Sequence, residues 1–387
     1  MHKWRDRCVY FATVLVSVLL IFFLNRALTD NHWFQEMRDA EKPIRAKVTS
    51  ILNKSEDNYS MDGENTVEEF EITFQARILS GERKGETVTA NQLFDSYTST
   101  DAKVVESGDK VLLYPVDAEI YNASWTFGDY IRSDGILFLC LLFFGLILLF
   151  GRMKGVHTIV SLSFTALSVF LVFVPSILAG YNIYLTSILT CVFIIVMTLL
   201  IINGWNKKSL VASVGCVSGV LVAGILSFVM DRVLSLSGVV DETSVYLQYV
   251  VEGLTIDLRA IIFAGIILGA VGAVMDVAMS LASSLLEVYG VSETPTVKSI
   301  VKSGFTIGRD IMGTMANTLI LAYIGSSLSV VILLIAYNSS MLALFNKEMI
   351  VVELLQALAG SIGILGTIPL TSLIAALVYV PRKGKEK

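Results

Sequence analysis

The sequence predicts an α-helical polytopic membrane protein with about eight transmembrane helices and a small extracytoplasmic all-β domain between helices 1 and 2. Apolar residues make up 54% of the 387 positions and charged residues only 16%. The mean hydropathy is +0.70, well outside the values of soluble domains. Apolar runs of about 20 residues, the length that crosses a bilayer, recur along the chain. One polar segment, 25–130, is instead long enough to fold as a separate domain.

Eight apolar stretches have the length of a membrane span. They cover approximately 8–24, 134–151, 157–179, 183–202, 211–230, 259–283, 311–336 and 357–380. Short cytoplasmic loops are enriched in Lys and Arg, and Lys3, Arg5 and Arg7 precede the first stretch. Every second loop after it and the C-terminal tail are basic as well. We therefore expect both termini in the cytoplasm.

These spans divide the chain into three segments. Residues 1–24 are interpreted as an uncleaved signal-anchor helix, because the residues after Leu24 lack the small-x-small pattern of a signal-peptide cleavage site. Residues 25–130 form the extracytoplasmic domain, and residues 131–387 form a seven-helix membrane domain with a basic cytoplasmic tail. The four cysteines lie in or beside spans, so neither a disulfide framework nor a cysteine metal site is expected.

The extracytoplasmic segment has the pattern of strands. Apolar and polar residues alternate from Phe70 to Ile78, which is typical of a strand with one buried face. A turn at 80–85 and a further β-prone run at 86–90 predict a hairpin. Ile44–Leu52 and Val111–Tyr114 are expected as further strands of a small barrel or sandwich. Trp125 to Tyr130 is interpreted as an aromatic anchor in the headgroup layer.

The stretch 259–283 carries an unusual stripe for a membrane span. Small and polar residues follow one another at helical spacings of three or four, so they share one face. They are Gly265, Gly269, Gly272, Asp276, Ser280 and Ser283. An ionisable group at membrane depth is costly and is a candidate functional site. The stripe fits a helix that lines a polar path, and it equally fits a packed interface in which Asp276 pairs with Arg309.

A second polar stripe begins the next span. Asp310, Thr314 and Asn317 share a face, with Gly313 beside them. Together with Asp276 and Ser280 they form the candidate transport or ion-binding set, because these oxygen ligands suit a divalent cation or a proton relay. If a metal binds, Asp276 and Asp310 are its expected ligands.

Other small residues are expected to serve helix packing. The residues expected to let helices pack closely are Gly265, Gly269, Gly272 and Gly313, together with the four-residue repeat Gly215, Gly219 and Ala223. The basic amphipathic segment 295–308 is interpreted as an interfacial helix, with a gating element as the alternative.

Three motifs resemble the YibE/F family of bacterial multi-pass membrane proteins. They are GAVMDVAMS from Gly272 to Ser280, GRDIMGTMANTL from Gly308 to Leu319, and Gly360-Ser361 followed by Pro369. The resemblance covers about 130–380, and the N-terminal anchor with its exported β domain is similar to the longer, YibE-type member. It implies a location in the bacterial cytoplasmic membrane and an architecture, and it carries no activity with it.

Two functions remain open at this level. The first is transport or export of a small cation or solute through a polar path between helices 6 and 7. The second is a non-transport receptor or assembly scaffold that acts through its β domain. No nucleotide-binding loop is present, and His2, His32 and His157 are scattered without a metal-binding or catalytic pattern, so no enzymatic activity is expected.

The expected partners follow from the same features. They are the lipid bilayer, a second copy of the chain or a YibF-type membrane protein, and an envelope ligand for residues 40–120. No basic stripe with interleaved aromatic residues suggests nucleic acid. No cofactor is expected with certainty; a divalent cation or proton enters only as a substrate.

Overall fold

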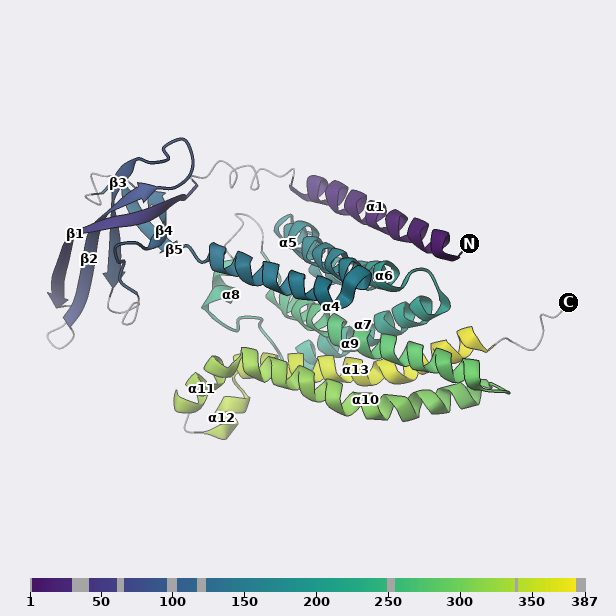
Figure 1. Cartoon of the computed structure of the whole chain (residues 1–387). Coiled ribbons are helices and arrows are strands. Elements are labelled where there is room, and N and C mark those ends of the chain that lie inside the picture. Colours follow the sequence, from purple (N-terminus) through teal and green to yellow (C-terminus); the bar gives the residue numbers. More distant parts are fainter. Residues whose placement is uncertain are drawn as a thin grey trace. The chain divides into compact units, whose positions relative to one another are not determined.

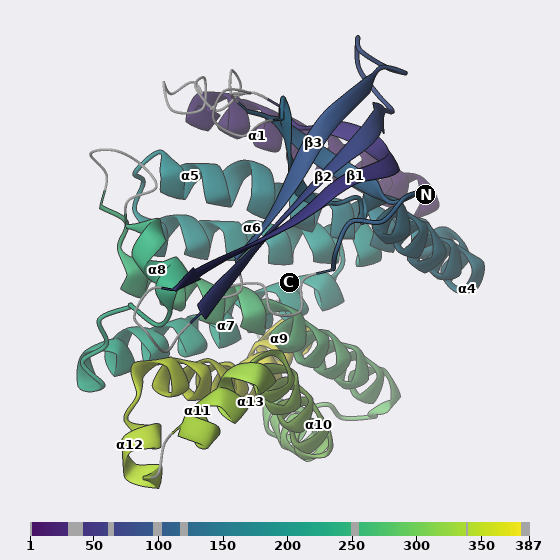
Figure 2. The same cartoon turned by 90° about the vertical axis from the view of Figure 1, so that its left-hand side faces the viewer.

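The computed structural model describes residues 2–29, 42–60, 66–95, 103–116, 123–248, 255–337 and 340–380. They belong to two compact units (Figures 1 and 2). One unit comprises Met1–Trp33 with Ile147–Lys387, and the other comprises Phe34–Leu146. Each unit is described by itself below.

The smaller unit is built on a closed five-stranded β-barrel. Its strands are β1 (Ile44–Ser60), β2 (Thr66–Ile78), β3 (Thr87–Asp95), β4 (Lys110–Pro115) and β5 (Trp125–Tyr130). They are ordered β1-β2-β3-β5-β4 around the barrel. The β3–β5 pair is parallel and the other pairs are antiparallel. This arrangement is that of an OB-type barrel. The β1–β4 pairing that closes it covers only Ile44–Lys47, whereas β1 pairs with β2 as far as Ser60.

The period-two pattern that predicted β2 is confirmed by its burial. Ile72, Phe74, Ala76 and Ile78 are all buried, whereas the residues between them are at least partly accessible. Phe74, Ala76 and Ile78 join residues of β1, β3 and β4 in one apolar core. The expectation for Trp125 to Tyr130 was wrong. This segment is strand β5, and Trp125 fills the barrel core because the strand alternates its faces.

A polar corner closes the barrel before β4. The Lys103 ammonium pairs with the Asp109 carboxylate at 3.0 Å, and the same carboxylate accepts a hydrogen bond from the Glu106 backbone N–H at 3.0 Å. Partial burial alone would raise the pKa of Asp109. The Glu106 N–H and the Lys103 ammonium outweigh it and hold this pKa below its usual value.

This corner predicts a pH-dependent contribution to barrel stability. Because the folded pKa of Asp109 is lowered, its contribution is present above the unfolded value of about 3.9. It disappears as the pH falls through the folded pKa. We expect Asp109→Asn to speed hydrogen exchange of β4 amides at pH 7. Below the folded pKa of Asp109, the β4 amides of the wild type and of Asp109→Asn should exchange at the same rate. A difference that persists at that pH would contradict the stabilising role of the Asp109 carboxylate.

The larger unit is helical. Its elements are α1 (His2–Thr29), α4 (Ser133–Ser168, whose first part belongs to the smaller unit), a π-helix (Val169–Phe173), α5 (Val174–Leu178), α6 (Ile183–Asn203), α7 (Lys207–Val233), α8 (Glu242–Leu247), α9 (Leu258–Val291), α10 (Val297–Ser326), α11 (Leu328–Tyr337), α12 (Met341–Phe345) and α13 (Glu348–Tyr379). Among the described residues, six helices are long and apolar enough to cross a membrane. A seventh is added if α10 and α11, bent by 67°, count as one span.

This count differs from the eight spans expected from the sequence. The stretches 134–151 and 157–179 belong to one apolar run, Ser133–Leu178, of 46 residues. Arg152 interrupts it with a positive φ of 48°. A Cβ at Gly155 would overlap the Ile147 carbonyl oxygen, whereas residues eight apart in a straight helix are separated by about 12 Å. The chain therefore doubles back at Arg152, between the two expected stretches.

The N-terminal helix is held to this run by two contacts. Asn25 Nδ2 donates a hydrogen bond of 2.7 Å to the Leu171 carbonyl oxygen in the π-helix. The rings of Tyr10 and His157 stack with their centroids 4.5 Å apart. A π-helix departs from the regular hydrogen-bond pattern of an α-helix. The Asn25 side-chain amide donates a hydrogen bond to one backbone carbonyl oxygen in this π-helical turn.

The core of the helical unit lies where α7, α9, α10 and α13 meet (Figure 2). Small residues bring α7 and α13 together. A Cβ at Gly215 would overlap the Thr371 hydroxyl, a Cβ at Gly219 would overlap the Thr367 hydroxyl, and Gly363 lies against Ala223. The repeat Gly215, Gly219 and Ala223 therefore serves close helix packing, as the sequence predicted.

The packing of Gly219 predicts a stability difference between two matched variants. A methyl group at Gly219 has no free space, so Gly219→Ala should cost about 1–3 kcal/mol. Nothing lies within 4 Å of a Cβ at Gly272, so Gly272→Ala should be neutral or slightly stabilising. Thermal unfolding in detergent micelles checks both, and a Gly219→Ala protein as stable as the wild type would refute the assigned packing.

Candidate functional site

The first candidate residues lie on α9, a helix of 34 residues. It begins at Asp257, whose side chain accepts hydrogen bonds from the backbone N–H groups of Arg259 and Ala260. One face is apolar and buried against α6, α7 and α13, through residues such as Val274 and Ala278. Asp276 lies near the middle of the helix, because α9 continues to Val291, beyond the end of the stretch 259–283.

The polar stripe of α9 lies on its exposed face. Its exposed members are Gly265, Gly269, Gly272, Asp276 and Ser280, while Ser283 is half-buried. Asp276 makes no hydrogen bond or ion pair with any residue in the described ranges. The stripe is therefore open to whatever surrounds this chain.

The four glycines expected to pack helices differ in their surroundings. A Cβ at Gly269 would approach the Tyr323 hydroxyl of α10 to 2.5 Å, so a side chain of the neighbouring helix lies against this position. Gly265, Gly272 and Gly313 have no neighbour within 4 Å of a Cβ. Within the chain, close packing is therefore provided by Gly269 and by glycines of α7, α10 and α13. The other three leave surface free.

The second group of candidate residues lies on the outer face of α10. The residues of α10 that are buried are Ile300, Gly304, Gly308 and Leu319. At about 100° per residue, Asp310 points roughly 200° away from Gly308. Asp310, Thr314 and Asn317 are exposed, and the Thr314 hydroxyl donates within its own helix to the Ile311 carbonyl oxygen.

The two carboxylates are not brought together within one chain. Gly269 lies against Tyr323, and Gly304 lies against Leu285, which fixes the antiparallel register of α9 and α10. By interpolation, Asp276 is level with Met315. Asp310 is level with Ser280, roughly one helical turn away along the axis. Because Asp310 also points outward, the described residues of α9 and α10 do not enclose both carboxylates in one path.

Arg309 does not neutralise Asp276 either. Arg309 is exposed, and no ion pair or hydrogen bond joins it to any residue that the structure describes. The packed-interface alternative, in which this pair would be buried inside the chain, is therefore not what the structure contains.

The segment 295–308 is part of α10 and not a separate interfacial helix. It begins with a capping box, in which Thr296 and Ser299 exchange side-chain and backbone hydrogen bonds. It then packs on α13, since a Cβ at Gly304 would overlap Ser372 and one at Gly308 would overlap Ile368. The basic residues of this segment lie on the remaining, accessible faces.

The described residues contain no ready-made metal centre. No group of three or more His, Cys, Asp or Glu side chains in them lies close enough to hold a metal ion. Neither Asp276 nor Asp310 belongs to such a group.

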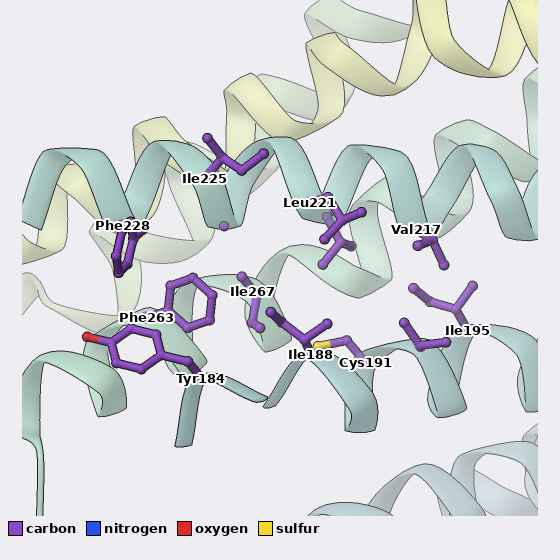
Figure 3. A pocket seen from close by; sticks show the side chains of 13 residues that line it. Tyr184, Ile188, Cys191, Ile195, Val217, Leu221, Ile225, Phe228, Phe263 and Ile267 are labelled. Atoms are coloured by element: carbon purple, nitrogen blue, oxygen red, sulfur yellow. The ribbon is translucent and has the colours of Figure 1, made fainter. Parts of the chain in front are cut away.

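An apolar pocket of about 240 Å³ lies elsewhere, between α6 and α7 (Figure 3). Phe263 and Ile267 of α9 line it together with residues such as Ile188 and Leu221. Tyr184 packs near its end, with its ring centroid 5.0 Å from that of Phe263. Cys191 and Tyr184 are its lining residues with a polar side-chain atom, and Phe263 and Ile267 reach it from the buried face of α9, away from the exposed stripe.

Tyr323 is the residue at this site that the sequence analysis missed. It lies against Gly269 on the same face as Asp276. No periodicity could reveal it, because its position depends on the register between α9 and α10.

Comparison with known proteins bears on the membrane domain. No curated protein and no solved structure matches the chain. A family model described as YibE/F-like protein matches residues 139–381, a range that contains α6 to α13 and both polar stripes. Together with its apolar helices, this match identifies a membrane protein. The chain belongs to the YibE/F-like protein family.

Proposed function

We propose that the chain is a subunit of a membrane transporter that moves a proton or small cation along the exposed stripe of α9. The observation that carries this proposal is Asp276, an acidic residue with no partner in the described residues on the outer face of an apolar helix. Ionisable side chains within spans are rare because they are costly, and they mark ion or proton pathways.

The position of Asp276 along α9 supports its placement inside the bilayer. The capping residue Asp257 and the exposed Arg259 mark one membrane surface. About 20 helical residues cross the hydrocarbon core, so the core segment runs from about Leu258 to Ala278 and includes Asp276. With the termini in the cytoplasm, as the basic loops favour, Asp276 lies nearer the cytoplasmic surface.

A second membrane-spanning chain completes the path in this proposal. Lipid tails offer no hydrogen bonds to a carboxyl group, and the exposed glycines Gly265 and Gly272 leave room for a helix backbone to approach. Asp276 and Ser280 then supply oxygen ligands on one side of the path. Asp310, Thr314 and Asn317 form a second polar face on α10, with Asp310 roughly one helical turn closer to the cytoplasm than Asp276.

The proposal predicts that flux depends on Asp276. In proteoliposomes, Asp276→Asn should lower proton or Mg²⁺ flux by at least about tenfold, because the amide cannot carry the charge or the proton that the step requires. Internal pyranine reports protons, and a magnesium-sensitive dye reports Mg²⁺.

Glu287→Gln is the matched control. Glu287 lies on the same face of α9 but about three turns farther on, beyond the hydrocarbon segment. This variant should keep wild-type flux. Equal flux in the wild type and in Asp276→Asn would remove Asp276 from the mechanism and the proposal with it.

A further inference from the structure

The β-barrel carries a groove that is separate from the membrane domain. The groove has a volume of about 570 Å³ and lies where β1, the end of β2, the β2–β3 turn and the loop before β4 meet. Lys47 of β1, Arg77 of β2 and Lys84 of the turn line it, together with Gly85 and Gly108. None of its lining residues is acidic.

These three cations differ from four other cations of the barrel unit, which form ion pairs. Arg45 and Lys110 both pair with Asp134. Arg83 pairs with Glu86, and Lys103 pairs with Asp109.

Lys47, Arg77 and Lys84 are exposed and have no hydrogen-bond or ion-pair partner among the described residues. Three like charges around one groove repel each other. An anion in the groove would relieve that repulsion.

The backbone shapes the groove without supplying its donors. Gly85 and Gly108 have φ values of 93° and 103°, a conformation that glycine adopts without strain. The Gly85 N–H donates to the Ile78 carbonyl oxygen, and the Gly108 N–H donates to the Val48 carbonyl oxygen, each at 2.9 Å. The free donors are therefore the side chains of Lys47, Arg77 and Lys84.

The chemistry of these donors points to phosphate. The planar fork of a guanidinium group can bind two phosphate oxygens at once, and ammonium groups add compact charge. A Cβ at Gly85 would lie 3.9 Å from a terminal nitrogen of Arg77, so this glycine leaves the approach to the guanidinium open. Three cations around one groove match a ligand with several closely spaced negative charges better than a single anion.

We propose that this groove binds a soluble, phosphate-bearing polyanion. The site is independent of Asp276 and of the transport proposed above. With the barrel outside the cytoplasm, the ligand is a phosphate-rich polymer of the cell envelope. The sequence predicted an envelope ligand for residues 40–120 without indicating its chemistry, and the groove assigns that ligand to the phosphate-bearing polyanions.

The test uses the full-length protein in nanodiscs of uncharged phosphatidylcholine, with end-labelled short-chain polyphosphate as the probe. Saturable binding is expected, and added salt should weaken it because exposed charges are screened. Arg77→Gln and Lys84→Gln should each raise Kd about fivefold, as expected for loss of one charge-assisted contact.

Arg83→Gln is the matched control, since it removes one positive charge from the same turn. Arg83 is paired with Glu86 and does not line the groove, so Kd should change by less than about twofold. If all three substitutions raised the Kd for polyphosphate equally, the binding would reflect general charge attraction, and the groove would not be a specific site.

Absence of polyphosphate binding would overturn the proposal outright. If the nanodiscs bind no polyphosphate but float together with phosphatidylglycerol vesicles, the ligand is an anionic lipid surface and the proposed polyanion site is overturned. All variants are compared by thermal unfolding, and because Arg77 and Lys84 are exposed and unpaired, their loss should leave the melting temperature unchanged.

Discussion

The inability of hydrocarbon to satisfy polar groups governs the helical unit. Helices α7 and α13 hide their small and hydroxyl-bearing faces from lipid by packing them together, as the contacts of Gly219 with Thr367 illustrate. Those hydroxyls also bond within their own helix, since Thr367 donates to the Gly363 carbonyl oxygen at 2.8 Å. Asp276 is the departure from this rule, because its face is left open. A function that needs a second protein chain at this face resolves the departure.

The sequence predicted most of the architecture because burial imposes a period on it. Alternation predicted β2, and the four-residue repeat at Gly215 predicted close packing. It misassigned Trp125 to Tyr130, since aromatic residues suit both a headgroup layer and a barrel core. It separated the apolar stretches 134–151 and 157–179, and the reversal of the chain at Arg152 lies between them.

The candidate site shows a different limit of sequence reasoning. Periodicity correctly grouped Gly265, Gly272 and Asp276 on one face of α9, because a helix fixes which residues share a side. Which way that face turns is set by packing against other helices, and here the same glycines that suggested packing are exposed. The offset between Asp276 and Asp310 likewise depends on the register of α9 and α10. Pairwise contacts such as that of Gly269 with Tyr323 determine it.

The central claim is that protein, and not lipid, covers the Asp276 face in the membrane. Spin labels in lipid bilayers test whether protein covers this face. One label is attached at Gly272→Cys and the other at Leu373→Cys, each in a protein whose native cysteines are replaced by serine. Both positions are exposed in the single chain, and Leu373 is an apolar reference on α13. The account predicts that oxygen reaches the Gly272 label much less than the Leu373 label. Equal oxygen accessibility at the two positions would contradict it.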